Sequence, residues 1–169
     1  MALKSDRSTL QTDISFFMNE TATRGGVVAL STAGSGASMD NGSALVTYAA
    51  SASGKVPMGL LMNDMVNLDL TRQHLNQHKD EVQKGGKVTL LQKGWVVTSN
   101  LEGTDPNGGE LAYLAHSGNI STSELTNHDA SDADGSSRVV GRFLSDVDED
   151  GYAKVYIDLP NMSRASGWQ

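Results

Sequence analysis

The sequence contains no cysteine among its 169 residues, and this absence removes several kinds of chemistry at once. A chain without thiols forms no disulfide, holds no metal through thiolates and has no cysteine nucleophile. Domains usually contain roughly 100–200 residues, so this length predicts one domain. A chain of this size can bury a core without covalent or metal cross-links. We therefore expect a single domain that is stabilised by its own packing.

Aromatic residues, proline and long apolar runs are also scarce. Aromatics make up 5% of the chain and there are 3 prolines, whereas glycine occurs 18 times. No apolar run approaches the ~20 residues that a membrane-spanning helix needs. Residues 1–13 are polar, where a secretory signal would be apolar. We expect no membrane partner, and a protein that is made in a cytoplasm and used or assembled there.

Basic residues are outnumbered by acidic ones, 13 to 20, which gives a net charge of −7. A surface of this sign is repelled by polyanions such as nucleic acid and by anionic membranes. The charge therefore predicts that nucleic acid is not a partner.

Short apolar runs separated by Gly, Ser, Asn and Asp are typical of a mainly β fold with many turns. In "YAKVYIDLP", Ala153, Val155 and Ile157 alternate with polar or amphipathic residues, as in a half-buried strand. "RVVGRFLSD" precedes it across a short acidic turn, which predicts an antiparallel hairpin with Val140 and Arg142 on one side of the first strand. We predict a compact antiparallel β-barrel or sandwich with long loops. Further candidate strands are "RGGVVALS", "ALVTYAA", "VPMGLLMND" and "LAYLAH".

Three segments can be separated along the chain. Residues 1–24 are predicted to form an N-terminal arm and first strand, residues 25–160 the β-rich domain, and residues 161–169 a C-terminal tail. Residues 1–11 are expected to be a loose arm. Residues 63–83 have a patchy period, which we interpret as a strand followed by a charged loop or a short helix.

Apolar side chains near the ends of the chain are candidates for contact with a partner. Phe16 and Met18 alternate with polar neighbours, and Phe16 and Phe17 either pack within the chain or add a strand to a neighbour's sheet. Trp168 lies in the tail, which either frays or docks its ring on a partner. The other tryptophan, Trp95, is expected in the core, within two strands or one strand bent at its centre. The candidate partner-interface residues are Phe16, Phe17, Met18 and Trp168.

Asp146, Asp148 and Asp150 alternate and run into Gly151, as at the start of a calcium-binding EF-hand loop. Such a loop needs a bidentate Glu at its twelfth position. Counted from Asp146, that position is Ile157, and the flanks are predicted strands where an EF-hand has helices. We interpret the segment as a hairpin turn, with a weak, water-rich calcium site as the alternative.

Other candidate chemistry is weaker. His74 and His78 are four residues apart, but zinc would need a further ligand, such as Asp80 or Glu81, and we interpret the stretch as exposed and polar. No serine lies in a Gly-x-Ser-x-Gly elbow. "QKGGKVTL" lacks the first glycine and the hydroxyl residue of a phosphate-binding loop. We predict no enzyme activity, no cofactor and no metal.

A series of short motifs resembles the head decoration (capsid cement) proteins of tailed bacteriophages. The motifs are, in order, "GGVVAL", "VPMGLLMNDMVNLD", "GGKVTLLQKGWVVT", "GELAYLAHSGNIS" and "VVGRFLSDVDEDGYAKVYIDLP". The likeness extends from about Gly25 to Pro160, and residues 63–83 look like an insertion relative to smaller members of the group.

The resemblance implies a structural virion protein on the exterior of the phage head. It would bind the major capsid protein and stabilise the capsid by bridging capsid subunits, as a homo-oligomer in which a trimer is favoured over a dimer. The alternative is a carbohydrate- or host-surface-binding β-module displayed on a virion. A third hypothesis is a metal-dependent enzyme that uses the aspartate or histidine clusters.

Overall fold

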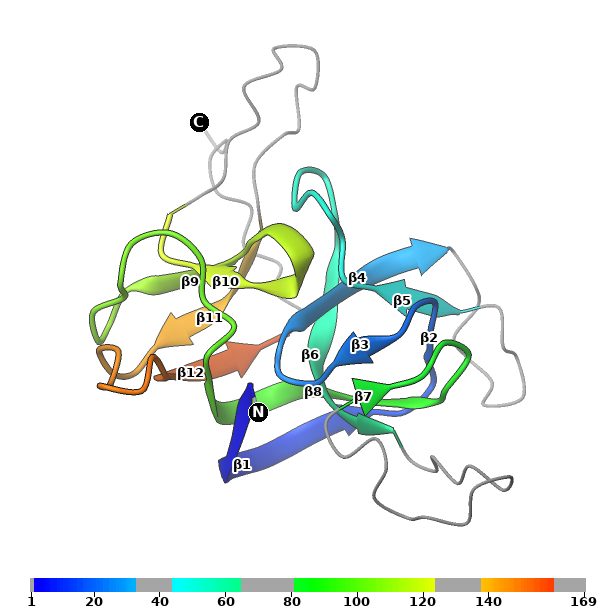
Figure 1. The fold of residues 1–169 in the computed structure, drawn as a ribbon, viewed down its shortest axis with the longest axis horizontal. Helices are drawn as coiled ribbons and strands as arrows, with labels where there is room; N and C mark the ends of the chain where they lie inside the picture. Colours follow the sequence, from blue (N-terminus) through cyan, green and yellow to red (C-terminus); the bar gives the residue numbers. More distant parts are fainter. Residues whose placement is uncertain (1, 33–43, 65–80, 124–137, 160–169) are drawn as a thin grey trace, which may run out of the picture.

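A computed structural model describes residues 2–32, 44–64, 81–123 and 138–159 (Figure 1). This part of the chain contains strands, one short 3-10 turn and no α-helix, which confirms the prediction of a mainly β protein. It contains no helix that is long and apolar enough to span a membrane. The elements are β1 (Leu3–Asp13), β2 (Phe17–Met18), β3 (Ala22–Thr23), β4 (Val27–Thr32), β5 (Leu45–Thr47), β6 (Pro57–Asp64), β7 (Glu81–Val82), β8 (Val88–Thr98), β9 (Leu111–Leu114), η1 (His116–Gly118), β10 (Ile120–Ser121), β11 (Val139–Phe143) and β12 (Ala153–Asp158).

Strand β8 organises the large sheet, because its two parts pair with different neighbours. Residues 88–91 pair with β6 and residues 93–98 pair with β12, both antiparallel. Strand β1 pairs with residues 90–98 along the opposite edge of β8. The sheet therefore divides into a first half-sheet of β6, β4, β5 and β2 and a second half-sheet of β12, β11, β9 and β10, which lie on either side of β8 in Figure 1. The described strands form no closed barrel, and only β2 and β5 pair in parallel in this sheet.

One hydrophobic core is shared by the two half-sheets. Leu91 and Val96 of β8 lie in the same buried cluster as Leu60 of the first half-sheet and Phe143 and Ile157 of the second. Each fully buried side chain of this size contributes about 1.5–3 kcal/mol relative to an exposed one. The shared core therefore couples the two half-sheets energetically.

The first half-sheet is buried on both faces. A second cluster contains Val28 of β4 and Leu61 of β6, together with Met18 of β2. The preceding residues, Val27 and Leu60, belong to the shared core. Side chains alternate between the faces of a strand, so consecutive apolar residues supply both clusters. The second half-sheet instead buries only its inner face, as the alternation in β12 predicts.

The two half-sheets also meet away from β8, at the ring of Tyr48. The hydroxyl of Tyr48 donates to the carbonyl oxygen of Thr23 at 2.7 Å and accepts from the amide of Gly26 at 3.1 Å. A side chain at Gly118, in η1, would collide with the Tyr48 ring, since an ideal Cβ there lies 2.4 Å from a ring carbon. Burial raises the pKa of Tyr48 well above its ordinary value, so the hydroxyl stays protonated and donates.

The N-terminal residues differ from the expected loose arm. Strand β1 runs antiparallel to β8 from Leu3, opposite Thr98, to Asp13, opposite Leu90. Leu3 belongs to the shared core. Most of the other described side chains of β1 are exposed or half-buried, because the strand has a neighbour on only one edge. Polar and charged residues are common on such edge strands, and they made this one resemble an arm.

Trp95 lies outside the core, contrary to the prediction. Residues 88–98 form one strand, and Trp95 pairs with Tyr156, whose side chain points outward from the second half-sheet. The ring of Trp95 is half-buried and lies 3.6 Å from the Lys154 ammonium, measured to the ring centroid. A cation over an indole ring is a favourable electrostatic contact at an exposed site.

Gly94 lies in the part of β8 that pairs with β12, two residues beyond the point at which β8 changes neighbours. Its φ is +143°, and an ideal Cβ there would lie 2.1 Å from the carbonyl oxygen of Ser8 on β1. Real Cβ atoms do not approach a backbone oxygen so closely, so glycine allows β1 to approach β8 here. Residues 65–80, which include most of the segment that we interpret as a strand followed by a charged loop or a short helix, lie outside the described residues.

We predict that Gly94→Ala lowers the free energy of unfolding by about 3 kcal/mol, because the methyl group forces β1 away from β8 in a conformation that alanine disfavours. Chemical denaturation measures this loss. Gly54→Ala is the matched control, since Gly54 also has positive φ, at +64°, but no atom lies within 4 Å of its ideal Cβ. The control is expected to cost about 1 kcal/mol. Equal losses in the two variants would contradict the steric role of Gly94.

Candidate functional site

The outward surface of the second half-sheet carries large side chains that the core does not bury. The pairing register aligns Leu111 of β9 with Arg142 of β11, Arg142 with Tyr156 of β12, and Tyr156 with Trp95 of β8. Residues opposite each other in a sheet lie on the same face. We call this surface the Arg142 face, and it contains Lys93, Trp95, Val97, Leu111, Tyr113, Val139, Arg142, Leu144, Lys154, Tyr156 and Asp158.

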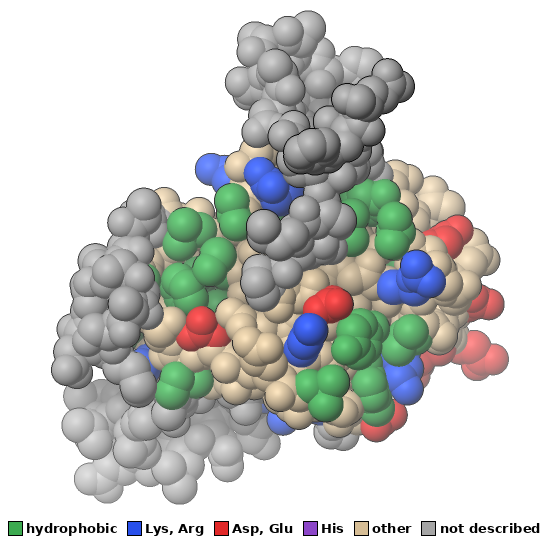
Figure 2. Space-filling model, turned by 180° about the vertical axis from the view of Figure 1, so that it is seen from behind, with side chains coloured by type: hydrophobic (Ala, Val, Ile, Leu, Met, Phe, Trp, Pro, Cys, Tyr) green, Lys and Arg blue, Asp and Glu red, His purple; other side chains and the backbone are tan. Residues whose placement is uncertain are grey.

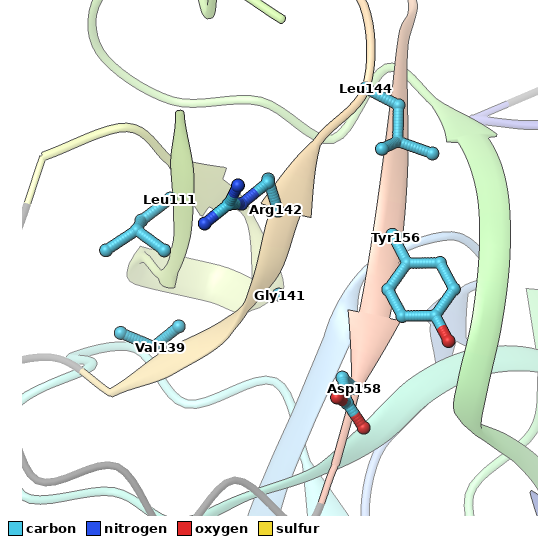
Figure 3. A pocket seen from close by; sticks show the side chains of 7 residues that line it. All are labelled: Leu111, Val139, Gly141, Arg142, Leu144, Tyr156 and Asp158. Carbon is cyan, nitrogen blue, oxygen red and sulfur yellow. The ribbon is translucent and has the colours of Figure 1, made fainter. Parts of the chain in front are cut away.

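A shallow hollow lies on the Arg142 face (Figure 3). Its volume is about 330 Å³, and its lining includes Leu111, Arg142, Leu144, Tyr156 and Asp158. Leu111 is 42% exposed and Leu144 is 46% exposed, which is high for leucine. In Figure 3 the Arg142 side chain extends from β11 toward Leu111 on β9. The hollow thus combines exposed apolar side chains with one guanidinium group.

An irregularity in β11 creates this arrangement. The register shifts between Val139 and Gly141, so Val139 and Arg142 both line the hollow while Val140 and Phe143 are in the core. The prediction that Val140 shares a side with Arg142 is therefore wrong, because a β-bulge reverses the alternation. Gly141 permits the close approach of β12, since an ideal Cβ there would lie 1.8 Å from the carbonyl oxygen of Tyr156.

The charges on the Arg142 face are mostly positive. The face contains Lys93, Lys154 and Arg142, and its one acidic side chain is Asp158. Lys93 lies 3.3 Å from Asp158, and the Lys154 ammonium lies over the Trp95 ring. No hydrogen bond or ion pair joins the Arg142 guanidinium to another described residue. The face therefore has the opposite sign to the whole chain, whose net charge is −7.

The acidic turn between β11 and β12 uses two of its carboxylates for backbone contacts. Asp146 accepts from the amide of Gly108 at 2.9 Å. Asp148 accepts through one oxygen from the amides of Asp150 and Tyr152, at 3.0 and 2.8 Å, and through the other from the Lys4 ammonium at 2.8 Å. Gly151 completes the turn with φ of +81°. The described strands on both sides confirm the predicted hairpin.

The Lys4 contact ties the N-terminal strand to this turn. The hydrogen bond from Lys4, followed by that from the Tyr152 amide, lowers the pKa of Asp148 below its ordinary value of 3.8. The same contact raises the pKa of Lys4 above 10.5. The Lys4 ammonium also lies 4.2 Å from the centroid of the Tyr152 ring.

Among the residues that the structure describes, no group of three or more His, Cys, Asp or Glu side chains is arranged to hold a metal.

His116 is the histidine that the structure describes. Its ring Nδ1 lies 2.9 Å from one carboxylate oxygen of Glu102, and its amide donates to the other at 2.9 Å. This pair fixes the 3-10 turn to the preceding loop. His74, His78 and His128 lie outside the described residues.

The predicted partner-interface residues have different positions. Phe16 and Met18 are buried in the second core cluster, where they pack against other residues of this chain. Phe17 is half-buried on β2, and the Lys87 ammonium lies 5.6 Å from its ring centroid. Trp168 lies outside the described residues. Hydrophobicity alone points to the most apolar side chains as candidate contacts. Leu111, which is far from Arg142 and Leu144 in sequence, lines the hollow with them only through strand pairing.

Comparison with known protein families identifies the chain. A family model described as "Structural cement protein (E217 gp24/Pam3 gp6)" matches residues 4–158. The chain belongs to the phage structural cement protein family. The cement protein is thus a structural component of the phage virion and not an enzyme, and its family name implies capsid binding and stabilisation. A search of curated proteins finds no match.

We predict that Lys4→Gln raises the pKa of Asp148 toward its ordinary value, because the largest cause of the lowering is removed while the amides of Asp150 and Tyr152 still donate. Folding lowers this pKa, so the stabilisation of the turn is present above the ordinary value and is lost as the pH falls through the lowered one. NMR titration of the Asp148 carboxyl carbon measures the change. Lys93→Gln is the control and should leave Asp148 unchanged. An unaltered Asp148 titration in Lys4→Gln would refute the pairing.

Proposed function

We propose that the cement protein binds the outer surface of the phage capsid and stabilises it by bridging major capsid protein subunits. The observation that carries this proposal is the family match, which spans residues 4–158 and therefore both half-sheets. This role requires a rigid protein. A protein that joins two capsid subunits resists their separation only if it keeps its own shape.

The fold is suited to resist mechanical force between the two half-sheets. Strand β8 carries hydrogen bonds to both half-sheets, and β1 lies along its other edge. A force that separates the half-sheets must therefore break antiparallel ladders and expose the shared core together. Exposure of that apolar surface costs about 25 cal/mol per Å². The cost opposes deformation when the pressure of packaged DNA pushes capsid subunits apart.

Binding at many equivalent sites on a shell favours an oligomeric cement protein. An oligomer that engages several capsid subunits at once gains avidity, because each later contact forms at a high effective concentration. Trimers are favoured over dimers in this proposal. Phe17, which is half-buried at the β2 end of the sheet, is the candidate contact between neighbours in the described part of the chain.

The oligomeric state is tested directly by sedimentation velocity of the purified cement protein at micromolar concentration. We expect one species with the mass of a trimer. In this proposal the trimer forms in solution, before it binds several capsid subunits at once. Dimers or monomers over the whole concentration range would exclude the trimer while leaving capsid binding open.

The proposed function predicts that capsids assembled without the cement protein release their DNA at a lower temperature than capsids that carry it. Addition of the purified protein should restore the higher temperature in a saturable way, since a protein that binds only the intact shell stabilises it by mass action. Dye-detected DNA release during a thermal ramp measures the effect. The control is an unrelated protein of similar size and net charge.

If the purified protein neither co-sediments with its own capsids nor raises their release temperature, the proposed function is wrong. If the protein binds capsids but does not raise their release temperature, the capsid is its partner but the protein does not stabilise it. A cement protein that protects only partly expanded capsids would point to a role before maturation is complete.

A further inference from the structure

The Arg142 face has the composition of a protein-binding surface. Leu111, Arg142, Tyr156 and Trp95 form a cross-strand row over four neighbouring strands. Neighbouring strands lie about 4.8 Å apart, so the row is roughly 14 Å long. Tyrosine, tryptophan and arginine are the residue types that most often dominate the binding energy of protein interfaces. Figure 2, the view opposite to Figure 1, shows hydrophobic side chains in groups with charged ones between them.

The charge distribution indicates the sign of the partner. The Arg142 guanidinium is exposed, and within the described part of the chain it has no hydrogen-bond acceptor or ion-pair partner. Two half-exposed leucines, Leu111 and Leu144, line the same hollow. A carboxylate that enters the hollow can accept two parallel hydrogen bonds from the guanidinium. Apolar groups beside that carboxylate would bury the leucines.

We propose that the Arg142 face is the surface by which the cement protein docks on the capsid, with the Arg142 guanidinium bound to a carboxylate of the major capsid protein that is flanked by apolar side chains. This inference rests on the proposed function and specifies its contact surface. Lys93 and Lys154 strengthen the preference for an acidic partner, because they leave the face with an excess of positive charge.

A second copy of the chain fits this face less well. Two Arg142 faces brought together by a two-fold axis would oppose their excess positive charges, and like charges in an interface are unfavourable. Nucleic acid also fits less well, because the chain as a whole carries a net charge of −7 and repels a polyanion. Phosphates would in addition leave the exposed leucines in water.

The test compares the binding of Arg142→Glu and wild-type cement protein to capsids that were assembled without it. We expect the variant to bind about a hundredfold more weakly, since it places a like charge against the capsid carboxylate and removes a bidentate contact. Arg142→Lys keeps the charge but not the fork geometry, and should lose about tenfold. Co-sedimentation over a concentration series gives the dissociation constants.

Lys55→Glu is the matched control, because it makes the same change of charge at an exposed residue before β6, in the first half-sheet. It should bind as the wild type does. Thermal unfolding of the free proteins should be similar for all variants, since Arg142 is exposed and makes no described contact that the fold depends on.

The outcomes separate the two proposals. If wild-type protein does not bind capsids, the proposed function fails and the inference fails with it. If wild-type, Arg142→Glu and Lys55→Glu proteins all bind equally, the function stands and the assignment of this face is wrong. Loss of self-association in Arg142→Glu by sedimentation, or DNA binding by the wild type that Arg142→Glu abolishes, would also overturn the inference, because each assigns the face to another partner.

Discussion

The pairing of β8 with three neighbours is the constraint on which the rest of the structure depends. One edge of this strand is divided between β6 and β12, and the other edge is paired with β1. The division places the two half-sheets around one core, and Gly94, close to the point of division, allows β1 to approach β8. Because the inner face of the second half-sheet is fixed by that core, its outer face is a fixed platform on which Leu111, Arg142 and Tyr156 keep their spacing.

Much of the strand content was predictable from sequence, since buried strands leave a clear apolar pattern. The consecutive apolar pairs of β4 and β6 and the alternation of β12 predicted these strands correctly. Strand β1 was not predictable in this way, because it pairs on one edge only and its residues are mostly polar. The hydrophobicity of Trp95 predicts a position in the core, whereas its pairing with Tyr156 puts it on the outer face. Strict alternation predicts the wrong side for Val140, because a β-bulge is not visible in the apolar pattern.

The candidate site was less predictable than the fold. Its central residues, Trp95, Leu111, Arg142 and Tyr156, are dispersed along the chain and meet only through the register of four strands. Selection by hydrophobicity instead found Phe16 and Met18, which the core uses. The acidic turn was correctly interpreted as a hairpin, and the structure adds what sequence did not show: Asp148 binds the N-terminal strand through Lys4.

The structure shows a cement protein whose shape is fixed by a shared core. The contact that we propose with the capsid uses one positively charged, partly apolar face of an otherwise acidic molecule. Cryo-microscopy of phage particles with and without the protein tests this account most directly. The account predicts density on the outside of the capsid between neighbouring capsid subunits, with β9, β11 and β12 turned toward the shell. Density inside the shell, or outside it with the Arg142 face turned to solvent, would contradict it.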